Sequence, residues 1–479
     1  EIYDTIPNGF LQLNGSGTAG SKKVVGMKPG KFSGAYLRWN GTTWHSDSIT
    51  DNTLDRAYDE GGRGNGRNII ADSGPVLIEG EDGLIVSGTF GSGITIGSPG
   101  GGTRAFYNPR KAAFRAGRVS GTHWNDANVG EYSFAGGQNT IASGKHSTAF
   151  GYGSAASGNY SIALGDSSIA TNKRSMALGE RARAVGISSV SIGKEALSEG
   201  QNAFSIGYKT RSEGPYSGAI GEASLSKGFH SFSYGYKDTA LGDYTLAMGY
   251  NSKAEGEGSV AIGYNTYTTN PYSVALGNNV QAVADRSFAL GSFVSTNNKN
   301  GSFILGDASN STVLKNSTLN QMMMRFDGGY ILYTNAATTL GNYVNTSSSG
   351  WSSISDRNKK ENFEQLSGEE ILRKLKGVPV SKWNYIDGSD DVKYIGPMAQ
   401  DFYRAFGLGG TDSLGINSIN IDGVNLAAVQ ALIIRTDELK KAQDELKVSN
   451  VKLDEQQVQI DAMRKELDEL KALINSSSK

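Results

Sequence analysis

Thirteen copies of one short segment, in which apolar and small residues alternate, occupy residues 133–306. With few exceptions each copy reads Ser, apolar, Ala or Ser, apolar, Gly, as in 161–165 (Ser-Ile-Ala-Leu-Gly). Successive copies begin fourteen residues apart, with a single extra residue before the last. Alternation with a period of two predicts a strand, and a fixed short period predicts a solenoid whose coils are stable only when stacked. Weaker segments between the copies, such as 155–158 and 182–186, would form return strands.

The two faces of this repeated strand differ in side-chain size. Its second and fourth positions are mostly Phe, Ile, Val, Leu or Met, whereas the first, third and fifth carry Ser, Ala and Gly on the other face. The small face allows another backbone to approach closely, and the fifth-position Gly suits a corner with positive φ. Thirteen coils would make a rod on the order of 60 Å long. Because so narrow a coil buries little apolar area, we expect several chains to share a central core.

Segments such as 259–263 (Ser-Val-Ala-Ile-Gly) and 273–277 (Ser-Val-Ala-Leu-Gly) resemble the head repeats of YadA-like trimeric autotransporter adhesins. The resemblance covers about thirteen units and implies a left-handed parallel β-roll that assembles as a homotrimer. That family also has a C-terminal membrane anchor of barrel-forming strands, and no such pattern is visible here. We therefore expect that the chain is not a complete autotransporter.

A leucine or isoleucine recurs at every seventh position near the C-terminus, at Leu432, Leu439, Leu446, Leu453, Ile460, Leu467 and Ile474. This spacing predicts a coiled coil over residues 426–479. The companion seam, three residues further on, is polar at first and apolar only near its end, at Met463 and Leu470. Polar seam positions can set register and oligomer number. Three strands would match a trimeric rod, and the sequence also admits two.

Residues 351–479 resemble the C-terminal intramolecular chaperone of phage endosialidases and tail fibres, an autoproteolytic serine peptidase. The matching segments are 355–360 (Ser-Asp-Arg-Asn-Lys-Lys), 383–385 (Trp-Asn-Tyr), 395–402 (Ile-Gly-Pro-Met-Ala-Gln-Asp-Phe) and 422–430 (Asp-Gly-Val-Asn-Leu-Ala-Ala-Val-Gln). Tyr394 stands where that family often has His. The resemblance implies a module that trimerises and guides the folding of upstream β-structure.

The same resemblance implies self-cleavage on the N-terminal side of a serine by a Ser/Lys dyad. The serine is Ser355, the lysine five residues on is Lys360 with Lys359 as its neighbour, and the scissile bond is Ile354–Ser355. A lysine accepts a hydroxyl proton only when it is neutral, so burial or a nearby cation must lower its pKa. We hypothesise that trimer assembly supplies that burial. The structural alternative is that Ser355 and Asp356 cap a turn and that the lysines are solvated.

Six regions follow from these patterns. Residues 1–60 form an N-terminal β module with a hairpin at Asn40-Gly41, and 61–132 a β-rich lead-in with strand-like stretches at 75–78 and 84–86. The β-roll spans 133–306. A β neck and joint spans 307–354, with strands at 322–326 and 330–333 around Gly328-Gly329 and a flexible joint at 347–350.

The chaperone core spans 355–425 and precedes the coiled coil of 426–479. Within it, Ser367-Gly368-Glu369-Glu370 is a capping-box pattern that opens an amphipathic helix. The expected fold is therefore mainly β: a homotrimeric parallel β-roll followed by an α+β chaperone module that ends in a coiled coil.

The composition argues against several kinds of binding site. The chain has 479 residues, a net charge of −1, no cysteine and four scattered histidines, so neither nucleic-acid binding, disulfides nor a metal site is expected. No apolar run is long enough to span a bilayer, so direct membrane insertion is not expected. The Gly-rich 62–66 neither follows a clear strand nor opens a helix, and is predicted to be a turn rather than a phosphate loop. No cofactor is expected.

These features predict an extracellular trimeric fibre of tail-fibre or adhesin type, on a virion tail or a bacterial cell surface, that binds a receptor or glycan. Single-turnover autoproteolysis is the only enzymatic activity expected. One alternative is a glycan-depolymerising tail spike, which would need two carboxylates ~5–9.5 Å apart. The acidic residues of the repeats lie dispersed at turns, at Glu180, Glu195, Glu199, Glu213 and Glu222. A second alternative is a structural spacer of a larger appendage.

Overall fold

The computed structural model describes residues 83–477, together with 75–79, 81 and the backbones of four strands nearer the N-terminus. Those strands are β1 (Leu11–Asn14), β2 (Val24–Met27), β3 (Ala35–Trp39) and β4 (Trp44–Ser48). β1 pairs antiparallel with β2. β3 pairs antiparallel with β4, as the hairpin predicted at Asn40-Gly41 requires. The turn residues Asn40-Gly41 and the Gly-rich 62–66 lie outside the described residues. The chain divides into two compact units, Glu1–Met323 and Met324–Lys479.

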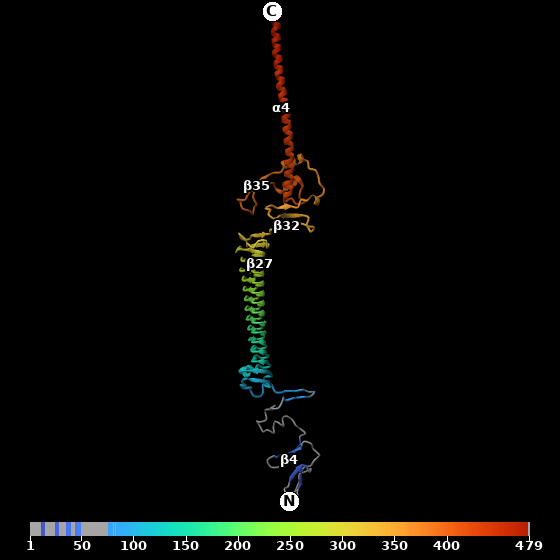
Figure 1. Cartoon of the computed structure of the whole chain (residues 1–479). Coiled ribbons are helices and arrows are strands. Elements are labelled where there is room, and N and C mark those ends of the chain that lie inside the picture. Colours follow the sequence, from blue (N-terminus) through green and yellow to red (C-terminus); the bar gives the residue numbers. More distant parts are fainter. Residues whose placement is uncertain are drawn as a thin grey trace. The chain divides into compact units, whose positions relative to one another are not determined.

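The first unit contains one sheet of 27 strands, wound into a parallel β-solenoid whose stacked coils run from the blue-green to the yellow part of Figure 1. The strands of the repeated segment are β7 (Phe134–Gln138), β9 (Thr148–Tyr152), β11 (Ile162–Asp166), β13 (Met176–Leu178), β15 (Val190–Ile192), β17 (Phe204–Tyr208), β19 (Gly218–Glu222), β21 (Phe232–Tyr236), β23 (Leu246–Tyr250) and β25 (Val260–Tyr264). We call them the phrase strands.

The return strands alternate with the phrase strands. They are β8 (Ile141–Ala142), β10 (Ala155–Ala156), β12 (Ile169–Ala170), β14 (Arg183–Ala184), β16 (Leu197–Ser198), β18 (Arg211–Ser212), β20 (Leu225–Ser226), β22 (Thr239–Ala240), β24 (Lys253–Ala254) and β26 (Tyr267–Thr268). The last coils contain β27 (Val274–Ala282), β28 (Phe288–Ser295), β29 (Phe303–Gly306), β30 (Leu314–Lys315) and β31 (Met322–Arg325).

Each strand pairs in parallel with the equivalent strand one coil away. Ile162 lies opposite both Thr148 and Met176, and Ala155 lies opposite Ile141 and Ile169. The pairing step equals the fourteen-residue period, so the backbone ladders run the length of the roll. The predicted parallel β-solenoid is confirmed.

The interior of the roll is built from small side chains. The third residue of each five-residue repeat, for example Ala135, Ala149 or Ala163, is fully buried. The second and fourth residues point outward: Phe150 is 47% exposed and Tyr234 49% exposed in the single chain. The predicted division into a small face and an apolar face is therefore correct, and the small face is the inner one.

Two local features close each corner of a coil. The fifth-position Gly has φ between +105° and +137° in the first twelve copies, and a Cβ there would overlap the carbonyl oxygen of the equivalent residue in the next coil. At the other end, the first-position hydroxyl usually donates to the carbonyl three residues earlier, as Ser147 does to Gly144 at 2.6 Å. Both the Gly and the Ser of the repeat are thus explained by stacking and turn geometry.

An antiparallel hairpin closes the N-terminal end of the roll. It consists of β5 (Gly102–Asn108) and β6 (Ala113–Val119), joined by the 3₁₀ turn η2 (Pro109–Lys111), and β6 pairs in parallel with β7. The turns η3 (Thr122–Trp124) and η4 (Asp126–Asn128) follow. Trp124 is fully buried and its indole N–H donates to the Thr140 carbonyl at 3.0 Å. A large aromatic side chain thus covers this end of a core that consists mainly of Ala and Ser.

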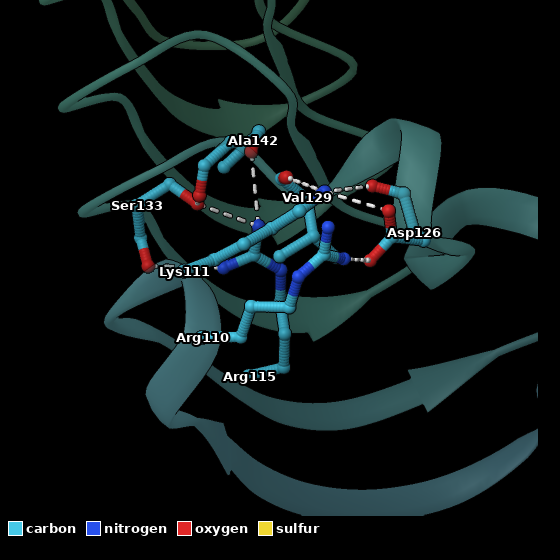
Figure 2. Close-up of polar contacts among 8 residues, drawn as sticks. Arg110, Lys111, Arg115, Asp126, Val129, Ser133 and Ala142 are labelled. Carbon is cyan, nitrogen blue, oxygen red and sulfur yellow. Dashed lines mark hydrogen bonds and ion pairs between the residues drawn. The ribbon is translucent and has the colours of Figure 1, made fainter. Parts of the chain in front are cut away.

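A buried arginine lies in the same cap (Figure 2). Arg115 is fully buried and donates to the carbonyls of Ser133 and Ala142, at 3.0 and 2.9 Å, and to the Ser133 hydroxyl at 2.8 Å. It therefore bonds to both sides of the first coil. Burial lowers its pKa to about 10. Beside it, Lys111 donates to the Val129 carbonyl and forms an ion pair of 3.1 Å with Asp126.

The strands predicted at 75–78 and 84–86 are wrong. Residues 75–79 and 83–99 contain no strand, and the apolar side chains of both stretches are exposed. Strand propensity becomes a strand only where another strand offers backbone partners, and these segments have none among the described residues.

The two strands predicted around Gly328-Gly329 are present but belong to different sheets. β31 continues the solenoid sheet, whereas β32 (Tyr330–Tyr333) pairs antiparallel with β33 (Gly341–Val344). β34 (Ser352–Ser353) completes this three-stranded sheet on the other side of β33. Residues 347–350, predicted as a joint, form the connection between β33 and β34.

The rest of the second unit is a small helical module. α2 (Gly368–Lys376) and α3 (Ala399–Phe406) flank a hairpin of β35 (Ser381–Trp383) and β36 (Tyr394–Gly396), and α4 (Ser418–Ser477) follows. Its core contains Ile371, Phe402, Val424 and Ala428. The predicted cap of α2 is confirmed, because the Ser367 hydroxyl accepts the Glu370 N–H.

Helix α4 has two parts. It begins at Ser418, ahead of the boundary expected at Leu426, and its first turns pack on α2 and α3 through Val424 and Ala428. From Leu432 to Ser477 every side chain is exposed, including the whole heptad row. Most of the stability of helices in proteins comes from packing of an apolar face, so the exposed heptad row indicates that this part of α4 packs on other chains.

Candidate functional site

The predicted scissile bond lies where the chain leaves the three-stranded sheet of the second unit. β34 pairs with β33, with Ser353 opposite Asn342, and the Ile354 N–H donates to the Gly341 carbonyl at 3.0 Å. Ile354 is half-buried, whereas Ser355 is exposed. The sheet therefore fixes the residue on the N-terminal side of the bond, and Ser355 starts the loop that follows.

A single 3₁₀ turn, η5 (Arg357–Lys359), begins two residues after Ser355. Its N-cap is Asp356, whose Oδ1 accepts the Asn358 N–H at 2.9 Å. Two backbone bonds complete the turn, from Lys359 to Asp356 and from Lys360 to Arg357, at 3.1 and 3.2 Å. The Arg357 guanidinium lies over the Phe363 ring, 5.5 Å from its centroid. The turn reverses the chain within the four residues that separate the predicted serine and lysine.

This reversal brings the two predicted catalytic side chains together. Lys360 Nζ donates to Ser355 Oγ at 2.6 Å. The lysine that contacts the serine is thus Lys360 and not its neighbour Lys359. The geometry meets the requirement that a nucleophile and its base lie within hydrogen-bond reach. The catalytic role of the pair remains a prediction.

In the single chain Ser355 and Lys360 are both exposed. With the proton on the lysine, the ammonium donates to the hydroxyl and cannot accept its proton. A base at this position has to be neutral, and burial is the environment that favours a neutral lysine. The side chains are therefore in place, and activation would need a change in their surroundings.

The residue that departs from the chaperone pattern, Tyr394, lies in an aromatic cluster on the β35–β36 hairpin. Its ring stacks on Trp383 with centroids 4.9 Å apart and lies 5.6 Å from Tyr385. Trp383 and Tyr394 are also directly paired residues of the two strands. Tyr394 thus packs against the opposite strand, as cross-strand aromatic pairs commonly do.

Four carboxylates of the repeats pair with basic residues, mostly one coil away. Glu180 contacts Lys194 at 3.0 Å, and Glu195 lies 3.5 Å from Arg181. Glu199 and Glu213 both contact Arg211, at 3.5 and 2.7 Å. A glycosidase needs two carboxyl groups that are free to act on a substrate, and each of these four carboxylates is instead engaged with a basic side chain. The geometry fits ion pairs between coils better than a catalytic pair.

Two features of this part of the chain escaped sequence analysis. Residues 113–117 (Ala-Phe-Arg-Ala-Gly) form a degenerate copy of the repeat, in register with 133–137, and its Gly117 has φ +137°. The step of twenty residues hid it, and the apolar-x-small-Gly pattern would have revealed it. The second feature is the ion pair between Glu369 of α2 and Arg435 of α4, which joins residues 66 positions apart.

Two known families match stretches of the chain. The YadA head domain repeat matches residues 142–168, 170–196, 240–266 and 269–293, and the chaperone of endosialidase matches residues 355–408. The chain thus contains YadA head repeats and a C-terminal chaperone-of-endosialidase domain. No curated protein matches it significantly. The coils continue without interruption through 197–239, between the matched stretches.

In the described part of the chain no helix is long and apolar enough to cross a membrane. Among the same residues no three histidine or acidic side chains are grouped as metal ligands would be.

Proposed function

We propose that this chain is the subunit of an extracellular homotrimeric fibre of tail-fibre or adhesin type, whose C-terminal domain directs trimerisation and then cleaves itself off. The observation that carries the proposal is the outward apolar face of the phrase strands. This apolar face continues into β27, β28 and β29 and repeats in almost every coil from Phe134 to Leu305, and its side chains are half-buried or exposed in the single chain. A continuous apolar strip of this kind indicates an interface between subunits.

A second apolar surface supports the same assembly. Along α4 the heptad residues are exposed in the single chain, from 41% at Ile460 to 70% at Leu439. Parallel packing of three such helices would cover the row and bring three rolls into the same register. The YadA-type repeats fit a trimer as well.

Sedimentation velocity and native mass measurement of the full chain test this assembly. The expected result is a trimer. Ile262→Asp, which places a carboxylate on the outward face of a phrase strand, should weaken it, whereas Ile169→Asp on the outward side of a return strand should not. A monomeric wild-type chain would contradict the proposal.

The proposed self-cleavage uses the Ser355–Lys360 pair. Neutral Lys360 takes the proton from Ser355 Oγ, which attacks the carbonyl carbon of Ile354. The Ile354–Ser355 C–N bond breaks as the lysine returns the proton to the departing nitrogen, which leaves an ester between the Ile354 acyl group and Ser355 Oγ. Water then hydrolyses this ester, giving an Ile354 carboxylate and a free Ser355 at the start of the released domain.

Intact-mass measurement tests the cleavage. Wild-type protein should yield two fragments that end at Ile354 and begin at Ser355. Ser355→Ala and Lys360→Met should remain full-length, and the matched Lys359→Met should still cleave. Identical full-length masses in the wild type and Ser355→Ala would contradict self-cleavage.

The released fibre is proposed to act by binding a cell-surface receptor or glycan, on a virion tail or a bacterial surface. The pairing of Glu180, Glu199 and Glu213 with basic side chains favours binding over glycan cleavage. Incubation of the mature trimer with host cells and with surface polysaccharide separates the candidates. Binding without release of reducing ends is expected. Release of reducing ends would instead support a depolymerase, and binding to neither would support a structural spacer.

A further inference from the structure

The contact between Ser355 and Lys360 depends on a turn that the two residues do not make themselves. Five residues of extended chain span roughly 16–18 Å, which is too far for a lysine side chain to return to the first residue. The 3₁₀ turn η5 shortens this span, because its rise is about 2 Å per residue, and its two backbone hydrogen bonds turn the chain back toward Ser355. The Nζ–Oγ distance of 2.6 Å is therefore a property of the turn.

A 3₁₀ turn of three residues is weak, because few hydrogen bonds offset the ordering of its backbone. The cap bond from the Asn358 N–H to Asp356 Oδ1, at 2.9 Å, supplies a hydrogen bond within the turn that the backbone does not. Asp356 also has the extended backbone typical of a cap, with φ −68° and ψ 128°. Its carboxylate therefore serves as the hydrogen-bond acceptor that caps the turn.

We infer that Asp356 is a positioning residue for self-cleavage: by capping η5 it holds Lys360 Nζ at the Ser355 hydroxyl. This inference rests on the proposed function, because it concerns the rate of that cleavage. Asp356 contacts neither reacting atom in the described structure and so acts through the lysine. Its role requires a hydrogen-bond acceptor at the cap and does not require a negative charge.

The distinction between acceptor and charge gives a direct test. Asn and Ser accept a cap hydrogen bond nearly as well as Asp, whereas Ala does not. Full-length chains carrying Asp356→Ala, Asp356→Asn or Asp356→Ser are made by cell-free translation, and the cleaved fraction is followed over time by gel and intact mass. Trimer formation is followed in parallel on native gels, and each rate is expressed per trimer formed.

We expect Asp356→Ala to cleave about five to thirty times more slowly than the wild type, as loss of a cap predicts. Asp356→Asn and Asp356→Ser should restore cleavage to within about twofold, since both can cap. The rate of Asp356→Asn should depend on pH as the wild-type rate does. The matched control is Asp412→Ala, which removes a similar cap on the Leu414 N–H in the same domain and should leave the rate unchanged.

Three results would overturn the inference. If Asp356→Ala trimers cleaved at the wild-type rate, the cap would be dispensable. Equally slow Asn, Ser and Ala variants, or a shifted pH profile for Asp356→Asn, would assign the role to the charge. A wild-type chain that trimerises but stays full-length would remove the proposed cleavage itself and this role with it, an outcome distinct from the other two.

Discussion

The β-roll and the free part of α4 both leave apolar side chains uncovered in the single chain, but they differ in what they satisfy by themselves. In the roll, each coil pairs its backbone with the coils beside it and buries Ala and Ser between its two strands. The helix from Leu432 onward satisfies its backbone hydrogen bonds but buries no side chain.

This difference indicates that the roll and the helix have different roles during assembly. The roll can propagate from coil to coil once it has started, but near-identical coils give little protection against a slipped register between chains. The helix carries a seam that changes along its length, from Arg435 to Leu470, and a changing seam specifies register. Alignment by the helix before the rolls stack would remove the risk of slippage.

The largest effect is expected from Leu453→Asp, which tests whether the helix holds the trimer. Three carboxylates would meet in one layer of the bundle, and each unpaired buried charge costs several kcal/mol. Sedimentation velocity should show loss of the trimer, and circular dichroism a loss of helix. Lys447→Asp, which lies outside the heptad row, is the control and should sediment as wild type. A trimeric Leu453→Asp protein would show that this row is not the interface.

The next effect concerns the stacking of the roll. Gly263→Ala should destabilise it by roughly 2–6 kcal/mol, because the residue has φ +137° and the added Cβ would overlap the Gly277 carbonyl. Thermal unfolding followed by far-UV circular dichroism measures this. The control is Gly153→Asn at an open corner with φ +61°, where the equivalent Asn251 already adopts φ +54°. Equal stability of both variants would contradict the stacking argument.

A smaller, stabilising effect is expected from Asp238→Ser within the roll. Asp238 is buried, its Oδ1 accepts the Ser252 N–H at 2.7 Å, and burial raises its pKa. The equivalent Ser224 and Ser252 donate instead to the carbonyls of Gly235 and Gly263. Replacement by Ser should add about 1 kcal/mol at neutral pH, since it removes a poorly paired buried carboxylate.

The same substitution should change the pH dependence of stability. Because the folded pKa of Asp238 lies above the unfolded value, the native state binds the proton more tightly. Wild-type stability therefore gains as pH falls from the raised pKa toward about 4. Asp238→Ser should lack this gain. Unfolding measured across that range would contradict the argument if the two proteins changed in parallel.

The smallest effect is expected at the ion pair that fastens α2 to α4. The Arg435 guanidinium lowers the pKa of Glu369, so the pair contributes above the unfolded pKa and is lost as pH falls through the folded value. Both groups are exposed, and Glu369→Gln should lower the melting temperature slightly at low salt and not at high salt. A large loss of trimer would instead show that the seam depends on this pair.

Much of the fold could be predicted because it repeats. A single copy such as 161–165 specifies its strand, its inner Ala163 and its corner Gly165, and thirteen copies in register leave few alternatives to a parallel solenoid. The prediction failed at 75–78 and 84–86, where strand propensity had no partner. It also missed the degenerate copy at 113–117, because this copy precedes the next by twenty residues and so lies outside the fourteen-residue period.

The candidate site was predictable only in part. The motif at 355–360 supplied the serine and the lysine through a family resemblance, and Asp356 was expected to cap a turn only in the structural alternative to catalysis. The structure shows that the two interpretations are compatible, because the capped turn is what brings Lys360 to Ser355. Spacing alone contains no information about that contact.

The sequence by itself determined the period, the strands, the division into small and apolar faces and the heptad row, because each depends on local order and side-chain type. Only the tertiary structure decided which face lies inside the roll, that Arg115 is buried in its cap, that β31 and β32 enter different sheets, and that Lys360 reaches Ser355. These outcomes depend on contacts between distant residues or on the path of one turn, and neither is encoded in a local pattern.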